Sequence, residues 1–288
     1  MHALQKNQFI LIAIIAALGA GMYLFGDLTG PPKDKSTPNA SNPSEHQHDP
    51  MNPSAEVAVM NIEKYSLEVE AKLSPDKLAK QRNLTEKAIA ENSAVAYKDL
   101  AEFWEGEREL NLAARYYKKA AFLENSEKSI TFAGNLLLAI MGKTEETSMR
   151  KWQALEAIAC FEEALKVNPD NVDTKIALAS CYTDGTGETM KGVTLLREVT
   201  QKDSNNIAAN IILGKLAIQS GQFDKAVKRL ERVIALRSDN TEAMYFLAEA
   251  YKGLGDKNKA IEMFEQCKRL VNKEEFSAEI DNYIKTFK

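Results

Sequence analysis

Apolar residues recur at helical spacing along most of the chain, from residue 54 to the C-terminus. The clearest stretch is 241–274, where a turn at Gly253-Leu254-Gly255-Asp256 separates two apolar stripes. The first stripe contains Met244, Leu247, Ala248 and Tyr251, and the second contains Ala260, Ile261, Phe264 and Cys267. This period predicts two short amphipathic helices that pack antiparallel, with Ala248 and Ala260 at their closest approach. The folded part has no long alternating run rich in Val and Ile, so a sheet is not expected.

The same arrangement returns at intervals of about 34 residues, which is typical of a repeat architecture. The copies are 94–127, 128–171, 172–206, 207–240 and 241–274. In the second copy the first half is distorted, and a polar stretch, Gly142 to Lys151, separates the halves. The third copy has one extra residue in its turn, TDGTGE.

These positions resemble the tetratricopeptide repeat (TPR), whose consensus is W-x2-L-G-x2-Y, then A-x3-F, then P. In the fifth copy Met244 stands for the Trp, Ala248 for the Gly and Asn272 for the Pro. The first copy carries Tyr97, Leu100-Ala101, Trp104, Ala113, Tyr117 and Ala120. The resemblance implies an all-α fold, a right-handed α-solenoid of about five helical hairpins with helical caps.

Two flanking segments are predicted to cover the ends of the solenoid. Residues 54–93 form an atypical helical pair, divided where Ser74 and Pro75 favour a helix start. Residues 275–288 form a final capping helix with apolar positions at helical spacing.

The first 28 residues are predicted to be a membrane-targeting segment. The apolar run Phe9–Phe25 would make a helix of about 25 Å, slightly shorter than the hydrocarbon core of a bilayer. An uncleaved signal anchor is favoured because the run continues past the small residues near Gly21, although a cleaved signal peptide remains an alternative. Residues 29–53 contain six of the eight prolines of the chain and are expected to be a disordered linker.

Lysine and arginine near the two ends of the apolar run are almost balanced, so the positive-inside rule leaves the orientation open. A very short N-terminal tail usually stays in the cytoplasm. We therefore expect a single-pass protein of the inner membrane with its repeats in the periplasm.

Composition argues against several classes of function. The net charge is −4, and Lys and Glu alternate along the helices without a basic stripe, which disfavours nucleic-acid binding. All three histidines precede the repeats, and no phosphate loop, G-x-S-x-G or paired C-x-x-C is present. His46 and His48 lie in the linker, where a specific metal site is not expected. We predict a non-enzyme with no cofactor, metal or small-molecule substrate.

The three cysteines, Cys160, Cys181 and Cys267, occupy core positions of predicted helices or adjoin them. They are interpreted as buried small hydrophobic residues. Cys160 and Cys181 belong to neighbouring helices, so an oxidising compartment leaves their pairing an open question.

The TPR resemblance implies that the first helices of successive repeats line a concave groove for an extended peptide or a partner helix. The corresponding positions are Lys98, Glu102 and Glu105 in the first copy, Ile176, Ser180 and Thr183 in the third, Ile211, Lys215 and Ile218 in the fourth, and Tyr245, Glu249 and Lys252 in the fifth. Glu102 disfavours the carboxylate-clamp variety, which requires Lys and Asn at set positions. Ile211 and Ile218 are expected to be left open for a partner's apolar side chains.

The predicted function is a membrane-anchored scaffold or adaptor that binds a partner protein or peptide segment without catalysis. The alternatives are a periplasmic chaperone-like or cytochrome c biogenesis subunit, and a structural subunit of an envelope complex. A groove that binds short segments favours the adaptor, whereas a spacer binds none.

Overall fold

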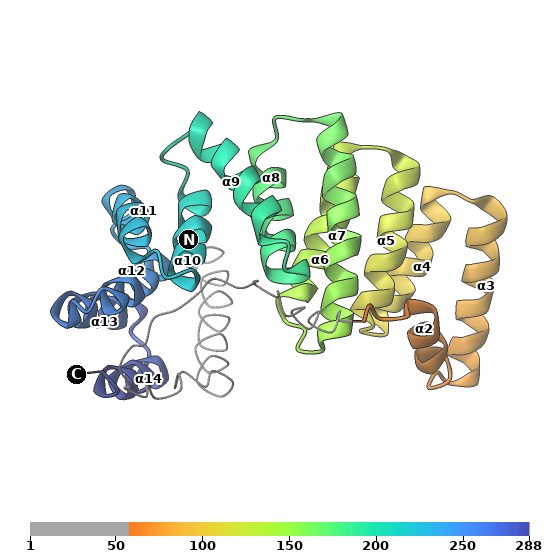
Figure 1. Ribbon diagram of the computed structural model, residues 1–288. Helices are drawn as coiled ribbons and strands as arrows, with labels where there is room; N and C mark the ends of the chain where they lie inside the picture. The colour runs from red at the N-terminus through yellow and green to blue at the C-terminus, as the bar shows by residue number, and fades with distance from the viewer. Residues whose placement is uncertain (1–57, 288) are drawn as a thin grey trace, which may run out of the picture. The chain divides into compact units, whose positions relative to one another are not determined.

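The structure is a computed structural model that describes residues 58–287. These residues contain thirteen α-helices and one π-helical segment, and no strand occurs among them (Figure 1). The elements are α2 (Ile62–Glu70), α3 (Pro75–Glu91), α4 (Ala94–Gly106), α5 (Leu110–Glu124), α6 (Glu127–Met141), α7 (Thr147–Val167), α8 (Val172–Ser180), η1 (Cys181–Thr186), α9 (Thr189–Lys202), α10 (Ile207–Gln219), α11 (Phe223–Leu236), α12 (Thr241–Gly253), α13 (Lys257–Val271) and α14 (Glu274–Lys285).

Helix pairs follow one another in chain order, each packed against the next (Figure 1). The five predicted copies coincide with the pairs α4–α5, α6–α7, α8 with η1 and α9, α10–α11, and α12–α13. First helices also contact one another across copies, as α8 does with α10 and α10 with α12. The all-α solenoid predicted from the repeat is therefore the architecture of residues 59–287, which belong to one compact unit.

The first helix of every copy begins at a side-chain cap. Ser93, Ser126, Asn171, Asn206 and Asn240 each accept a hydrogen bond from the backbone N–H three residues ahead, at 2.8–3.2 Å. Such a cap satisfies a donor that has no partner inside the helix. The same bond starts α3, where Ser74 precedes Pro75 as the sequence predicts.

Small residues bring the two helices of a hairpin close together, and large residues fill the space beside them. In the fifth copy Ala248, Ala260 and Phe264 have no exposed surface. In the second copy Gly134 takes the place of Ala248, and Phe161 packs directly over it. The core is thus built from the positions that carry the repeat pattern.

Two irregular copies differ from their predicted form. The second copy is regular in its first helix, α6, and much of the stretch from Gly142 to Lys151 belongs to α7, which begins at Thr147. In the third copy the extra residue does not lengthen the turn. It is absorbed at the end of α8 by the π-helical segment η1, because a π-helical turn accommodates one more residue than an α-helical turn.

The terminal helices cover the ends of the repeats. At the N-terminal end, α3 contacts α4, and the backbone N–H of Met60 donates to the carbonyl of Ser148 at 3.1 Å. At the C-terminal end, α14 packs on α13, with Phe276, Ile280 and Ile284 buried.

Within residues 58–287, none of the helices combines the length and the apolar character needed to cross a bilayer. The predicted span Phe9–Phe25 and the predicted linker 29–53 lie outside the described residues.

Candidate partner-binding surface

The predicted groove residues of α4 lie at the surface. Lys98 pairs with Glu124 at the end of α5, Glu102 is exposed, and Glu105 accepts a hydrogen bond from the Tyr117 hydroxyl at 2.7 Å. These interactions hold the Lys98 and Glu105 side chains in place at the two ends of the predicted groove face of α4. Glu102 between them remains open to a partner.

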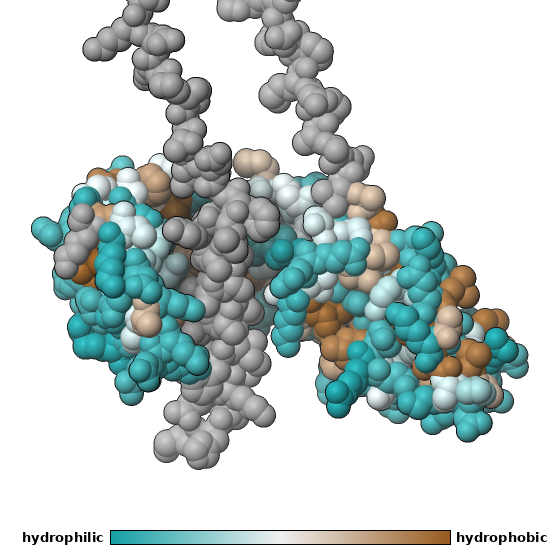
Figure 2. All heavy atoms as spheres, turned by 90° about the horizontal axis from the view of Figure 1, so that it is seen from below, coloured by the Kyte–Doolittle hydropathy of each residue, from teal (hydrophilic) through white to brown (hydrophobic). Residues whose placement is uncertain are grey.

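An exposed apolar side chain, which the sequence analysis missed, extends the same face of α4. Val95 is 66% exposed and precedes Lys98 by three residues, so the two share one side of the helix. Apolar side chains also reach the surface elsewhere on the N-terminal repeats, between hydrophilic ones (Figure 2). Among the large apolar side chains, the most exposed on α2, α3, α4 and α6 are Leu67, Ile89, Val95 and Phe132.

The third copy turns its predicted groove residues partly inward. Ile176 is half-buried and packs on the apolar cluster between α8, α9 and α10. Ser180 and Thr183 donate their hydroxyl protons to the backbone carbonyls of Ile176 and Ser180, at 3.2 and 3.3 Å. The hydroxyl groups of this copy are therefore engaged by the chain itself.

The prediction that Ile211 is left open for a partner is wrong, because Ile211 is only 6% exposed. It belongs to the core of the last two hairpins, and Ile218 packs partly buried against the same cluster. Close stacking of α10 on α12 covers this face, and helical spacing within α10 alone does not reveal that neighbour.

Lys215 connects the third copy to the fourth. Its Nζ lies 3.1 and 3.2 Å from the two carboxylate oxygens of Asp184 in η1. The π-helical segment η1, which accommodates the extra residue of this copy, thus carries the Asp184 carboxylate that faces α10. Burial raises the pKa of the Glu242 carboxyl group on α12, and the positive charge of Lys215 opposes part of this rise.

The groove residues of α12 contact the C-terminal helix. The Nζ of Lys252 donates to the hydroxyl of Tyr283 and lies over the rings of Tyr283 and Phe287, at 4.2 and 5.2 Å from their centroids. Tyr245 packs edge-on against Phe264, with ring centroids 5.5 Å apart. In this copy the predicted groove face is therefore partly covered by α14.

Glu249 lies in the same covered region, 3.9 Å from Lys252. Burial raises the pKa of its carboxyl group, and Lys252 opposes this by favouring the charged form. Its Oε1 atom is buried without a hydrogen-bond partner in the described part of the chain. The sequence marked Glu249 as a groove residue, but the role of Tyr283 above it was not predicted.

The twelve predicted residues thus do not form one continuous open surface. The structure leaves the face of α4 open, links Lys215 to Asp184, buries Ile211 and covers part of α12. Asp184 and Tyr283 were missed because each joins the face from a neighbouring element, whereas Glu242 had a signal in its spacing of three residues from Tyr245 on α12.

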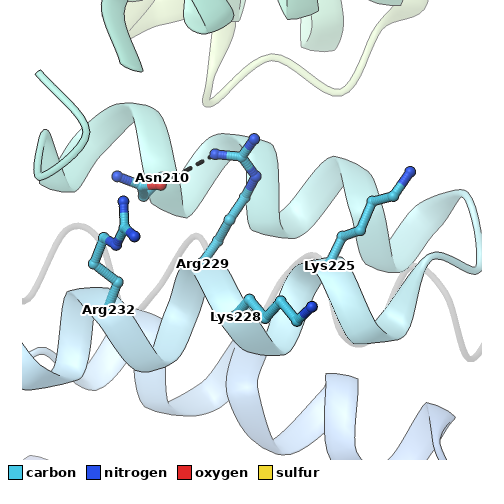
Figure 3. A pocket seen from close by; sticks show the side chains of 5 residues that line it. All are labelled: Asn210, Lys225, Lys228, Arg229 and Arg232. Atoms are coloured by element: carbon cyan, nitrogen blue, oxygen red, sulfur yellow. Dashed lines mark hydrogen bonds between the residues drawn. The ribbon is translucent and has the colours of Figure 1, made fainter. Parts of the chain in front are cut away.

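A separate cavity of about 290 Å³ lies between α10 and α11, lined by Asn210, Lys225, Lys228, Arg229 and Arg232 (Figure 3). Arg229 and Arg232 point toward α10, where the Nη1 atom of Arg229 donates to the Oδ1 atom of Asn210 at 3.1 Å. The expectation that no helix carries a basic stripe is wrong for α11. Its four cations are spaced by three, one and three residues, which places them on one face.

The remaining chemistry of the described residues is consistent with a structural role for the thiols. Cys160, Cys181 and Cys267 are free and buried, and burial raises the pKa of each to about 12. Between residues 58 and 287, no group of three or more His, Cys, Asp or Glu residues is placed to hold a metal ion.

Comparison with known proteins identifies a tetratricopeptide repeat in the chain. The sequence profile of this repeat matches residues 217–275, the end of the fourth copy and the fifth. The chain is also 26% identical over 179 residues to the Protein CTR9 homolog of Arabidopsis thaliana, an alignment that covers 58% of this chain. The aligned part of the chain spans only 15% of the length of that relative.

Several solved helical-repeat structures are similar to the chain at low sequence identity. A tetratricopeptide repeat protein from Parabacteroides merdae has a TM-score of 0.51 and 18% identity, covering 68% of this chain and 75% of that chain. The MamA protein has a TM-score of 0.48 and 18% identity, covering 63% of this chain and 93% of that one. YrrB, described as a TPR protein with an unusual peptide-binding site, has a TM-score of 0.45 and 20% identity, covering 69% and 97%. The similarity to the Parabacteroides protein supports the helical-repeat fold predicted from the sequence.

Proposed function

We propose that this protein is a membrane-anchored scaffold that binds a segment of a partner protein along the first helices of its repeats, without catalysis. The observation that carries the proposal is the open face of α4, where exposed Val95 and Glu102 flank Lys98. Val95 is 66% exposed on the same side of α4 as Lys98 and Glu102, so a partner segment on this face would remove its apolar surface from water. Helical repeats use such surfaces for extended segments and helices.

The groove proposal is tested by replacing Val95. Val95→Glu should abolish recovery of a partner that is cross-linked through a photoreactive residue at Glu102 and identified by mass spectrometry. The matched control is Ile89→Glu on α3, which is 68% exposed and should leave recovery unchanged. Because both side chains are largely exposed, neither change should alter the melting temperature by more than a degree or two.

Two outcomes contradict the groove proposal. Equal loss of the cross-linked partner in both variants would mean that the α4 face has no special role. Absence of any cross-linked protein when the chain carries only the photoreactive residue at Glu102 would favour a structural spacer. A spacer remains in its complex but binds no separate segment.

The anchor is proposed from the apolar run Phe9–Phe25, together with the short N-terminal tail and the polar linker that follows. We expect the mature protein to retain Met1 and to sediment with membranes after a high-salt wash, because such a wash removes proteins held by charge alone. An N-terminus mapped near Gly21 or Asp27, together with soluble protein, would show instead that the segment is a removed signal. A periplasmic location of the repeats is proposed with the anchor, and protease accessibility in spheroplasts tests it.

A further inference from the structure

The basic face of α11 is surrounded by neutral partners. Lys225 donates to the side chain of Gln222 at 2.6 Å, Arg229 to Asn210 at 3.1 Å, and Arg232 to the carbonyl of Ser204 at 3.1 Å. Across residues 58–287, no salt bridge involves Lys225, Lys228, Arg229 or Arg232, although many other lysines pair with carboxylates. The positive charge of this face is therefore not neutralised by the described part of the chain.

Like charges crowd around Arg229. Burial lowers the pKa of its guanidinium, and the charges of Arg197 on α9 and Arg232 lower it further. A bound anion removes this repulsion, so it interacts more strongly here than beside an isolated surface lysine.

The cavity beside these cations lies where the fourth copy departs from the repeat consensus. Asn210 lies one 34-residue period before Met244, the position at which the TPR consensus has Trp. Asn210 is 2% exposed, and its amide donates to the carbonyls of Ser204 and Asn206 at 3.0 and 2.8 Å. A space of about 290 Å³ lies beside this short side chain, and the guanidinium of Arg229 borders it.

The two arginines supply the geometry that an oxyanion needs. A guanidinium carries five N–H donors in a planar fork, and only one donor of each has a partner described above. The free donors match the oxygens of a carboxylate or phosphate in a bidentate arrangement. Lys225 and Lys228 lie on the same helix face and also line the cavity, so they add to its positive charge.

We propose that this face binds an acidic segment of a partner protein, with one carboxylate or phosphate group held between Arg229 and Arg232. From Lys225 to Arg232 on α11, the stripe is about 10 Å long at 1.5 Å per residue, which corresponds to three or four extended residues. A nucleic acid needs a longer basic track, and the overall charge of −4 disfavours it.

The site is separate from the groove of the first helices. At about 100° per residue, Lys215 lies roughly 140° around α10 from Asn210. A partner in the groove and an acidic segment at α11 therefore occupy different faces. The two surfaces allow the scaffold to hold two segments at once.

The test measures fluorescence anisotropy of a labelled ten-residue glutamate peptide with the whole 288-residue chain in mild detergent. We expect saturable binding that weakens as salt increases. The double substitution Arg229→Gln and Arg232→Gln should weaken it about tenfold to a hundredfold, as expected for losing charge-assisted hydrogen bonds. The control, Arg82→Gln with Arg269→Gln, removes the same charge from exposed sites on α3 and α13 and should change the affinity less than about twofold.

A second variant separates binding from folding. Lys225→Glu with Lys228→Glu changes only exposed positions, and it should also reduce affinity while circular dichroism and melting remain unchanged. A phosphoserine peptide of equal charge distinguishes phosphate from carboxylate as the preferred anion. The proposal is overturned if the control loses as much affinity as the arginine variant, if the peptide does not bind saturably, or if a single-stranded oligonucleotide of equal charge binds more tightly.

Discussion

Phe264→Ala should lower the free energy of unfolding by about 3–5 kcal/mol, the range expected when a fully buried aromatic side chain is deleted. Phe264 has no exposed surface, and its ring is 5.5 Å from Tyr245 and 5.6 Å from Tyr283 between centroids. Tyr283 lies on α14, so the substitution removes part of the contact that holds the C-terminal helix as well as the core of the last hairpin. Urea unfolding followed by circular dichroism measures the loss.

The position of the loss is as informative as its size. Because a solenoid is stabilised by interfaces between neighbours, amide hydrogen exchange should accelerate first in α12, α13 and α14 and least in α4 and α5. Phe132→Ala is the control, since Phe132 is 54% exposed and should cost less than about 1 kcal/mol. Uniform acceleration of exchange along the chain would mean that residues 59–288 unfold as one cooperative unit, contrary to the nearest-neighbour description.

The positions that form the fold were predictable because they repeat. The recurring pattern located the hairpins even where the second copy is about ten residues longer, and the small residues at the closest approach, such as Ala248 and Ala260, are fully buried as expected. Each copy repeats the same local contacts, so a period in sequence translates directly into a period in structure. The π-helix at Cys181–Thr186 was not predictable in this way, because an added residue fits either a turn or a widened helix.

The candidate site was less predictable, because its exposure depends on neighbours that helical spacing does not specify. Ile211 has the spacing of a groove residue, but packing in the last two hairpins buries it. Lys252 is covered by Tyr283 from α14, a helix that was predicted to cap the repeats but whose contacts with α12 its helical spacing does not specify. The basic face of α11 had a visible signal in the spacing of its four cations. That signal was missed because the charges of the chain were considered as a whole.

The glycine at the closest approach of α6 and α7 provides the second large effect. Gly134→Ala should destabilise the protein by about 1–3 kcal/mol, the cost of overpacking a core. An added Cβ atom would lie 2.7 Å from Cε1 of Phe161, which has no exposed surface and therefore little room to move. The gain in helix propensity from Gly to Ala is at most about 1 kcal/mol and does not offset this clash.

The cost of a Gly→Ala substitution should depend on the atoms that surround the added Cβ atom, and two further glycines test this. At Gly214 the added Cβ atom would lie 2.9 Å from Cγ of the equally buried Leu230, a longer distance than the 2.7 Å at Gly134, so Gly214→Ala should cost less than Gly134→Ala. At Gly106 no atom lies within 4 Å of the added Cβ atom, so Gly106→Ala should be neutral or stabilising by up to about 1 kcal/mol. Thermal unfolding of the three variants measures the order. If Gly134→Ala and Gly106→Ala had the same effect, the close contact with Phe161 would not limit how tightly the second hairpin packs.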